Sequence, residues 1–256
     1  MELRVNHFKR AIKENRLQVG LWSGLSSNVT VEVLANAGFD WMLLDTEHSP
    51  NELPMVHSQL QAIAQGSAHP IVRPAWNDTV IIKRFLDVGA QTLLIPFVQS
   101  PEEAKRAVEA TRYPPKGVRG LTNSGRASRY GRVKDYVKNA SSEICLLVQV
   151  ETREALKQIE AIASVDGVDG VFIGPADLSN SFGYFGNWNH PELEAAFKDA
   201  GSRIRSTGKA AGFLTANEEE AKKLIGWGFN FMAVGSDLGL LTKNADALAK
   251  RFKPGT

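Results

Sequence analysis

The chain has 256 residues, with 30 Lys and Arg against 28 Asp and Glu, and a formal net charge of +2 at pH 7. This length matches one eight-stranded α/β barrel domain, and so small a net charge argues against nucleic acid or an anionic membrane as the main partner. The single cysteine, Cys145, lies in an apolar run, which favours a packing role over a nucleophile. No secretory or membrane-spanning pattern is present, which predicts a cytoplasmic protein.

Short apolar runs alternate with amphipathic stretches along the whole chain, which is the pattern of parallel strands covered by helices. Eight such runs occur, at residues 19–22, 41–45, 71–74, 92–96, 144–151, 170–173, 211–214 and 231–235. Eight strand-then-helix units in a chain of this length favour a closed TIM (β/α)8 barrel over an open doubly wound sheet. We therefore predict a single-domain barrel over residues 1–256.

Three helix-to-strand junctions share one outline, in which an apolar helix ends at a glycine and the next strand follows. The glycines are Gly38, Gly89 and Gly228. Glycine takes the left-handed conformation of a helix C-cap at no steric cost. These three positions are therefore interpreted as structural.

The longest connection lies between the fourth and fifth predicted strands, and it is rich in arginine from Arg112 to Arg132. Because it follows a strand, we expect it on the catalytic face of the barrel, where long loops act as lids or interfaces. Its arginines suggest an anionic ligand or an acidic neighbouring subunit. A solvated basic loop is an equally good explanation for any one of them.

The active site of a barrel lies at the carboxyl ends of its strands, so the polar residues that end or follow each apolar run are the candidate site residues. They are Trp22, Ser23, Asp45, Thr46, Glu47, His48, Arg73, Gln149, Glu151, Asp177, Ser236 and Asp237.

Glu151 and Asp177 follow consecutive strands and can converge on one point. Two carboxylates completed by water and substrate oxygens suit Mg²⁺, Mn²⁺ or Co²⁺. Zinc is a poor match, since no pair of His or Cys residues has the spacing of zinc ligands. The alternative for either acid alone is a helix cap or a salt bridge.

Arg73 ends an apolar strand, so its guanidinium must reach the barrel mouth or a buried acid. At the mouth it could bind a carboxylate or stabilise an enolate oxygen. His48 follows a strand-end acid and is the candidate proton carrier. His7, His57, His69 and His190 are expected on helices or in loops, with surface or structural roles. A Schiff-base mechanism needs a lysine at the mouth, and neither Lys116 nor Lys209 is placed there.

Seven motifs together resemble the HpcH/HpaI aldolase family and cover nearly the whole chain in order. They are GLWSGLSS at residues 20–27, AGFDW at 37–41, DTEHSPN at 45–51, VRP at 72–74, ATRYPP at 110–115, QVETR at 149–153 and GVFIGPADL at 170–178. The resemblance implies a metal-dependent lyase that cleaves a 4-hydroxy-2-oxo acid to pyruvate and an aldehyde. A divalent cation chelated by the 2-oxo acid would promote this reaction by acidifying the adjacent carbon.

The resemblance also implies roles for individual residues. His48 is the implied general base, with its basicity raised by Asp87, which can act from a neighbouring subunit. Arg73 is the implied electrostatic stabiliser of the enolate. The implied metal ligands are Glu151 and Asp177, and the substrate-binding groups are Gln149, the amides of Ala176 and Asp177, Trp22 and Leu214. Family members form homo-oligomers, so a trimer or a hexamer is expected.

Two alternatives remain open at this point. The same residues could serve a hydroxypyruvate aldolase or an aldolase of 2-keto-3-deoxy sugar acids. The chain could also be a catalytically silent barrel that binds an anionic metabolite or serves as an assembly partner.

Overall fold

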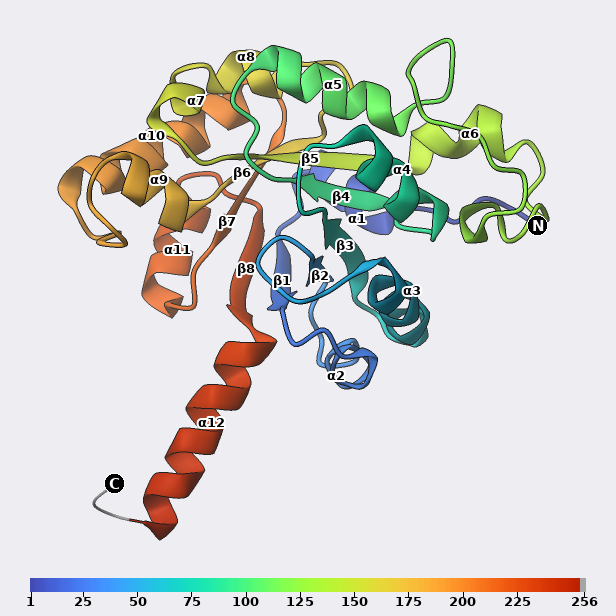
Figure 1. The fold of residues 1–256 in the computed structure, drawn as a ribbon. Helices are drawn as coiled ribbons and strands as arrows, with labels where there is room; N and C mark the ends of the chain where they lie inside the picture. Colours follow the sequence, from blue (N-terminus) through green and yellow to red (C-terminus); the bar gives the residue numbers. More distant parts are fainter. Residues whose placement is uncertain (254–256) are drawn as a thin grey trace.

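The computed structural model describes residues 1–253, and the eight predicted strands form a closed parallel barrel in the order β1 to β8 (Figure 1). The strands are β1 (Gln18–Ser23), β2 (Trp41–Asp45), β3 (His69–Arg73), β4 (Thr92–Ile95), β5 (Cys145–Val150), β6 (Gly170–Ile173), β7 (Ala210–Leu214) and β8 (Phe231–Ser236). Each strand pairs with the next, and β8 pairs with β1, which closes the barrel. The predicted fold class is confirmed.

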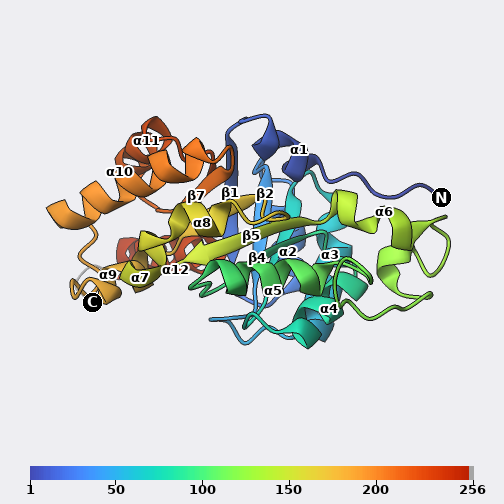
Figure 2. The same ribbon diagram turned by 90° about the horizontal axis from the view of Figure 1, so that it is seen from above.

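Helices surround the barrel when it is viewed from two directions (Figures 1 and 2). They are α1 (His7–Lys13), α2 (Asn28–Leu34), α3 (Leu53–Ala62), α4 (Thr79–Asp87), α5 (Pro101–Thr111), α6 (Tyr136–Glu143), α7 (Arg153–Lys157), α8 (Ile159–Ala163), α9 (Pro175–Ser181), α10 (Pro191–Ser206), α11 (Glu218–Gly226) and α12 (Asp237–Phe252), with 3-10 turns η1 (Ile63–Gln65) and η2 (Arg126–Ser128). None of these helices has the length and apolar character needed to cross a membrane.

Apolar side chains pack in two layers, because strands of a closed barrel point alternate side chains inward and outward. The inner layer includes Trp22, Trp41, Phe172 and Phe231, and the outer layer fills the space between strands and helices. Cys145 is fully buried in the inner layer, and burial raises the pKa of its thiol. The predicted packing role of this cysteine is therefore confirmed.

Helix α1 closes the amino-terminal end of the barrel. Its Phe8 ring lies 6.2 Å from the ring of Trp41, 5.7 Å from that of His69 and 6.1 Å from that of Phe231. His69 is the first residue of β3, so the expectation that it lies on a helix or in a loop is wrong, although its role is structural. Its Nε2 lies 2.7 Å from the hydroxyl of Thr92, on the neighbouring strand.

The three predicted C-cap glycines all have positive φ, at 98° for Gly38, 100° for Gly89 and 102° for Gly228. Any other residue would be strained there. Each of them turns the chain from the end of a helix towards the start of a strand at the amino-terminal end of the barrel.

The arginine-rich connection lies at the amino-terminal end of the barrel, so its expected position on the catalytic face is wrong. Helix α5 starts near the carboxyl end of β4 and runs back, and residues 112–135 therefore begin at the opposite end. Gln91, just before β4, and Ile144, just before β5, line one cavity together with Arg126 and Arg129 of this connection.

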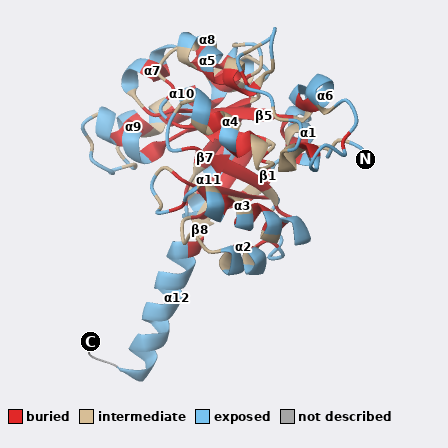
Figure 3. Ribbon diagram, turned by 45° about the vertical axis from the view of Figure 1, so that its right-hand side comes forward, coloured by how far each residue is buried: buried red, intermediate tan, exposed pale blue. Residues whose placement is uncertain are grey.

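Helix α12 departs from the usual arrangement, in which each helix packs back on its strand. It follows β8 and projects away from the body of the barrel (Figure 1). Asp237 is the only described residue of α12 that is buried, and the rest of the helix is exposed (Figure 3).

Candidate functional site

Arg73 lies at the centre of a polar cluster at the carboxyl ends of β2, β3 and β5. Parallel pairing of β2 with β3 places Asp45 directly beside Arg73, and both residues end their strands. The Nε and Nη2 atoms of Arg73 each donate to a different carboxylate oxygen of Asp45 at 2.8 Å. This bidentate contact fixes the plane of the guanidinium.

The remaining edge of the guanidinium faces two further groups. The Nη1 atom lies 2.7 Å from a carboxylate oxygen of Glu47 and donates to the side-chain carbonyl of Gln149 at 3.4 Å. The indole ring of Trp22 covers one face, with its centroid 4.9 Å from the Arg73 Cζ. Arg73 is thus held on three sides, and its third nitrogen, Nη1, contacts both Gln149 and Glu47.

Glu151 follows the last residue of β5 and is almost fully buried. The Gln149 amide donates to its Oε1 at 2.8 Å, and the backbone N–H of Phe97 donates to its Oε2 at 3.0 Å. A Cβ atom on Gly174 would lie only 2.2 Å from Oε1. Glycine at position 174 therefore leaves the space that this carboxylate occupies.

The carboxylates of this cluster affect one another. Burial and the nearby charges of Glu47 and Asp177 raise the pKa of Glu151 to about 7. Burial also raises the pKa of Glu47, against the effect of Arg73. Burial alone would raise the pKa of Asp45, but its hydrogen bonds to Arg73 and the charge of that arginine lower it overall.

Asp177 lies in the first turn of α9 after β6, where it is exposed at the barrel mouth. Ala176 precedes it and is also exposed. Trp22 and Leu214, at the ends of β1 and β7, pack in the inner layer below this mouth. The structure thus brings the sequence-predicted metal ligands and substrate-binding residues to one end of the barrel.

His48 lies in the loop after β2, and 66% of its side-chain surface is exposed. Its Nε2 lies 3.8 Å from a carboxylate oxygen of Glu47. An exposed imidazole beside a carboxylate is free to approach a substrate proton, as a general base must.

Asp87 does not join this cluster within one chain. It is the last residue of α4, which runs back from β3 towards the amino-terminal end of the barrel. There its carboxylate accepts a hydrogen bond of 2.9 Å from the Nη2 of Arg119, whose side chain is buried. Any contact between Asp87 and His48 therefore requires a second chain.

Ser23 and Asp237, two other strand-end residues, have a structural role. The carboxylate of Asp237 accepts hydrogen bonds from the hydroxyl of Ser23 at 2.9 Å and from the backbone N–H of Gly24 at 2.9 Å. Asp237 therefore joins the loop after β1 to the start of α12.

Asp45 and Glu47 were predicted to lie at the mouth of the barrel, but their contacts with Arg73 were not predicted. The sequence did contain a signal for the contact between Asp45 and Arg73. These residues end β2 and β3 with opposite charges, and adjacent parallel strands bring their carboxyl ends together. The stacked aromatic pair Trp76 and Phe97, with ring centroids 5.7 Å apart in the loops after β3 and β4, was missed. Aromatic residues in two separate loops leave no common pattern in the sequence.

The donor set of this site fits a hard divalent cation. Three carboxylates, from Asp45, Glu47 and Glu151, lie near Arg73, and Asp177 lies near Glu47 and Glu151. Among residues 1–253, no group of three His, Cys, Asp or Glu residues has metal-binding geometry. A cation here would be held by two carboxylates, with oxygens of water and substrate completing its shell.

Comparison with known proteins agrees with this picture. The model of the family described as HpcH/HpaI aldolase/citrate lyase matches residues 18–244. The chain is 57% identical to a pyruvate aldolase of Rhizobium etli, covering 98% of this chain and 99% of that one. It is 58% identical to a 4-hydroxy-2-oxo-heptane-1,7-dioate aldolase of Klebsiella pneumoniae, covering 96% and 94%.

A solved structure of an HpcH/HpaI aldolase/citrate lyase family protein from Burkholderia cenocepacia superposes with a TM-score of 0.93. It is 35% identical to this chain, and the match covers 97% of this chain and 100% of that one. Both the sequence and the fold therefore match over nearly the full length. The chain belongs to the HpcH/HpaI aldolase/citrate lyase family.

Proposed function

We propose that the chain is a divalent-metal-dependent pyruvate aldolase. It reversibly cleaves a 4-hydroxy-2-oxo acid, such as 4-hydroxy-2-oxoheptanedioate, to pyruvate and an aldehyde such as succinic semialdehyde. The observation that carries the proposal is the cluster in which Gln149 joins Arg73 to Glu151, beside the exposed His48. Family membership and the names of the two relatives support this substrate class.

Glu151 and Asp177 would hold Mg²⁺, Mn²⁺ or Co²⁺. When bound, the cation supplies Lewis-acid polarisation of the 2-oxo group. Gln149 is held between Arg73 and Glu151, and it orients the 2-oxo acid together with the backbone amides at Ala176 and Asp177. Trp22 and Leu214, which pack in the inner layer below the mouth, would form the floor of the substrate site.

In the cleavage direction His48 takes the proton from the 4-hydroxyl group of the substrate. The C3–C4 bond then breaks, its electron pair remains on the pyruvate half, and the 4-carbon leaves as an aldehyde. Arg73 stabilises the negative charge that develops on the enolate oxygen. A proton delivered to C3 completes pyruvate.

The test is deuterium exchange at the pyruvate methyl group with added Mn²⁺ or Mg²⁺, followed by cleavage assays. Glu151→Gln and Asp177→Asn should abolish exchange, and His48→Ala should lower cleavage by about 10² to 10⁴. Glu218→Gln, an exposed carboxylate change on α11, is the control. Full, chelator-insensitive activity in the first two variants would overturn the metal role, and a panel of aldehydes with pyruvate and hydroxypyruvate would rank the substrates.

The predicted homo-oligomer also has support in the structure. Leu238, Leu241, Ala245, Leu248 and Phe252 recur at spacings of three and four along α12, which places them on one face of the helix. The four larger side chains are at least half exposed. A continuous apolar face of this kind on a projecting helix marks a protein contact.

The surface that fits this helix lies on the same chain. A groove of about 380 Å³ is bordered by α2, with Val29 and Val33, and by the start of α12, with Leu240 and Leu241. We propose that α12 of a second copy packs against α2 of this chain, and that α12 of this chain packs in the same way against α2 of the second copy. A reciprocal exchange forms pairs of chains, which favours the hexamer over the trimer.

Light scattering on Leu241→Glu and Leu248→Glu tests this arrangement. Both variants should reduce the oligomer to smaller species, whereas Lys243→Glu, a charge change on the same exposed helix, should leave it intact. An unchanged mass in both leucine variants would contradict the exchange.

A further inference from the structure

A cavity of about 310 Å³ lies at the amino-terminal end of the barrel, opposite the proposed aldolase site. Its walls come from the N-terminal segment before α1, the turn between α4 and β4, the η2 turn and α6. The N-terminal segment runs along the barrel towards α6 (Figure 2), and its first backbone nitrogen donates to the carbonyl of Arg132 at 3.1 Å. The cavity is therefore built by segments distant in sequence.

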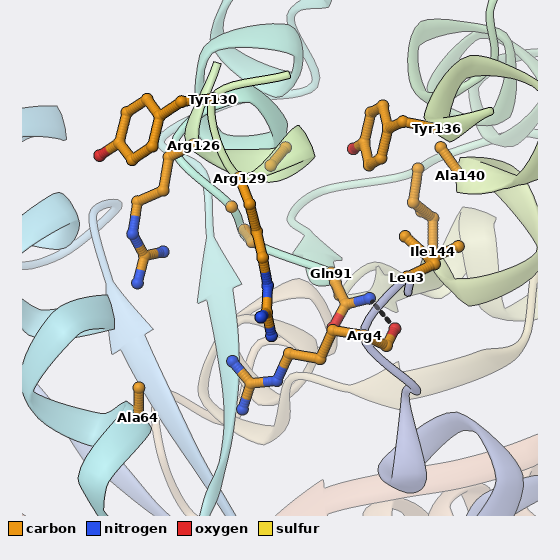
Figure 4. A pocket seen from close by; sticks show the side chains of 13 residues that line it. Leu3, Arg4, Ala64, Gln91, Arg126, Arg129, Tyr130, Tyr136, Ala140 and Ile144 are labelled. Carbon is orange, nitrogen blue, oxygen red and sulfur yellow. Dashed lines mark hydrogen bonds between the residues drawn. The ribbon is translucent and has the colours of Figure 1, made fainter. Parts of the chain in front are cut away.

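Three arginines, Arg4, Arg126 and Arg129, line this cavity and differ in how they are held. Arg126 is fixed, because its guanidinium donates to the carbonyl of Val88 at 2.9 Å and to that of Leu60 at 3.1 Å. A Cβ on residue 89 would lie 2.7 Å from Arg126 Nη1, so Gly89 leaves room for this guanidinium. Figure 4 shows the guanidinium ends of Arg4 and Arg129 lying close together beside Gln91.

The charged side chains that line this cavity within residues 1–253 are all arginines. None of the residues that line it within the described chain is Asp or Glu. Partial burial and the charge of Arg129 lower the pKa of Arg4, and burial, together with the charge of Arg4, lowers the pKa of Arg126. By contrast, Arg112, Arg119 and Arg203, elsewhere on the chain, each pair with a carboxylate.

Three arginines that line one cavity, with Arg4 and Arg129 exposed and Arg126 half-buried, match the chemistry of an oxyanion. Each guanidinium presents planar N–H donors that bind phosphate or carboxylate oxygens in pairs. A bound dianion would offset the repulsion between Arg4 and Arg129, whose side chains are exposed to solvent at this cavity. The side-chain amide of Gln91 already donates to the carbonyl of Arg4 at 2.6 Å, which orders the segment that carries this arginine.

We propose that this cavity is a second ligand site, which binds a compact dianion such as a phosphate group or a dicarboxylate. The site is separate from the aldolase chemistry and does not depend on it. Its ligand would contact residues 126–129, and the same connection carries Arg119, the partner of Asp87. Anion binding would therefore stabilise the connection that holds a candidate catalytic residue.

Isothermal titration calorimetry of the full chain with inorganic phosphate, and separately with succinate, tests the site. Both titrations are made with chelator present and ionic strength held constant with NaCl, so that neither a metal nor general screening accounts for the heat. We expect saturable binding of one anion per chain. Binding of phosphate but not of succinate identifies a phosphate site, and binding of succinate but not of phosphate identifies a dicarboxylate site.

The informative variant is Arg4→Gln combined with Arg129→Gln, because neither side chain holds the fold as Arg126 does. This double variant should bind the anion at least tenfold more weakly, with unchanged circular dichroism and, in buffer without phosphate or succinate, unchanged aldolase activity. Arg106→Gln on α5, an exposed arginine outside the cavity, should bind as the unmodified protein does. No saturable binding, or equal affinity in the double variant, would overturn the proposal.

Discussion

At the carboxyl-terminal end of the barrel Arg73 lies among three carboxylates, with Asp177 close to two of them. At the amino-terminal end three arginines line a cavity, and none of its lining residues within residues 1–253 is a carboxylate. The first end balances part of its charge through a bidentate contact with Asp45 and leaves a negative excess near Glu151. The amino-terminal end has an excess of positive charge, from Arg4, Arg126 and Arg129. The difference indicates a cation at one end and an anion at the other, on a chain whose formal net charge is only +2.

The largest effect is expected from Arg73→Gln, which removes the guanidinium that lies among Asp45, Glu47 and Glu151. The variant leaves Asp45 buried without its partner, so the free energy of unfolding should fall by about 3 to 5 kcal/mol, and cleavage activity should fall by about 10² to 10³. Urea unfolding and a cleavage assay measure both. The double variant Arg73→Gln with Asp45→Asn should recover part of the stability, and equal losses in the single and double variants would contradict the pairing argument.

Gly174→Ala tests the space around Glu151 without changing any charge. The added methyl group must displace the Glu151 carboxylate, so Mn²⁺ affinity should fall by about 10- to 100-fold while the fold is kept. Gly226→Ala, where an added Cβ meets nothing within 4 Å, is the matched control. Metal titration by calorimetry gives the answer, and unchanged affinity in Gly174→Ala would exclude Glu151 as a ligand.

His69 offers a test at the positive end. Burial, with the positive charges of Arg4 and His7, lowers its pKa to about 3, compared with 6.5 in the unfolded chain. Between pH 6.5 and pH 3, His69 is therefore protonated in the unfolded chain but neutral in the folded chain. The stability contributed by neutral His69 is lost progressively as pH falls below about 6.5.

Between pH 7.5 and pH 5, His69 should account for a loss of roughly 1 to 2 kcal/mol in the free energy of unfolding. Urea unfolding of the unmodified chain and of His69→Gln at both pH values isolates this contribution. His57→Gln on α3 is the control. If the free energy of unfolding depended on pH identically in His69→Gln and the unmodified chain, the low pKa of His69 would be contradicted.

The smallest effect is expected from Arg129→Gln in chloride buffer. Removing one of the facing arginines relieves repulsion on Arg4, and such surface charge effects are worth about 1 kcal/mol or less. The melting temperature should rise by about 1 to 3 °C, and added phosphate should reduce or reverse the difference. A lower melting temperature in both buffers would mean that Arg129 stabilises the fold through contacts other than charge.

The sequence alone determined the barrel, the residues that face its mouth and the family. Alternation of apolar runs with amphipathic helices is a local property, and the positive φ of Gly38, Gly89 and Gly228 follows from local turn chemistry. Glu151, Asp177, Arg73, His48 and Gln149 were found because strand ends in a barrel share one face. Their individual roles in catalysis remain predictions.

Only the tertiary structure decided which side chains meet. The reversal of the chain along α5 carries the arginine-rich connection to the amino-terminal end, and the direction of α4 places Asp87 against Arg119 there. The pairing of Asp45 and Glu47 with Arg73 and the projection of α12 likewise depend on the arrangement of whole elements. Contacts between residues tens of positions apart are set by packing, which no local pattern encodes.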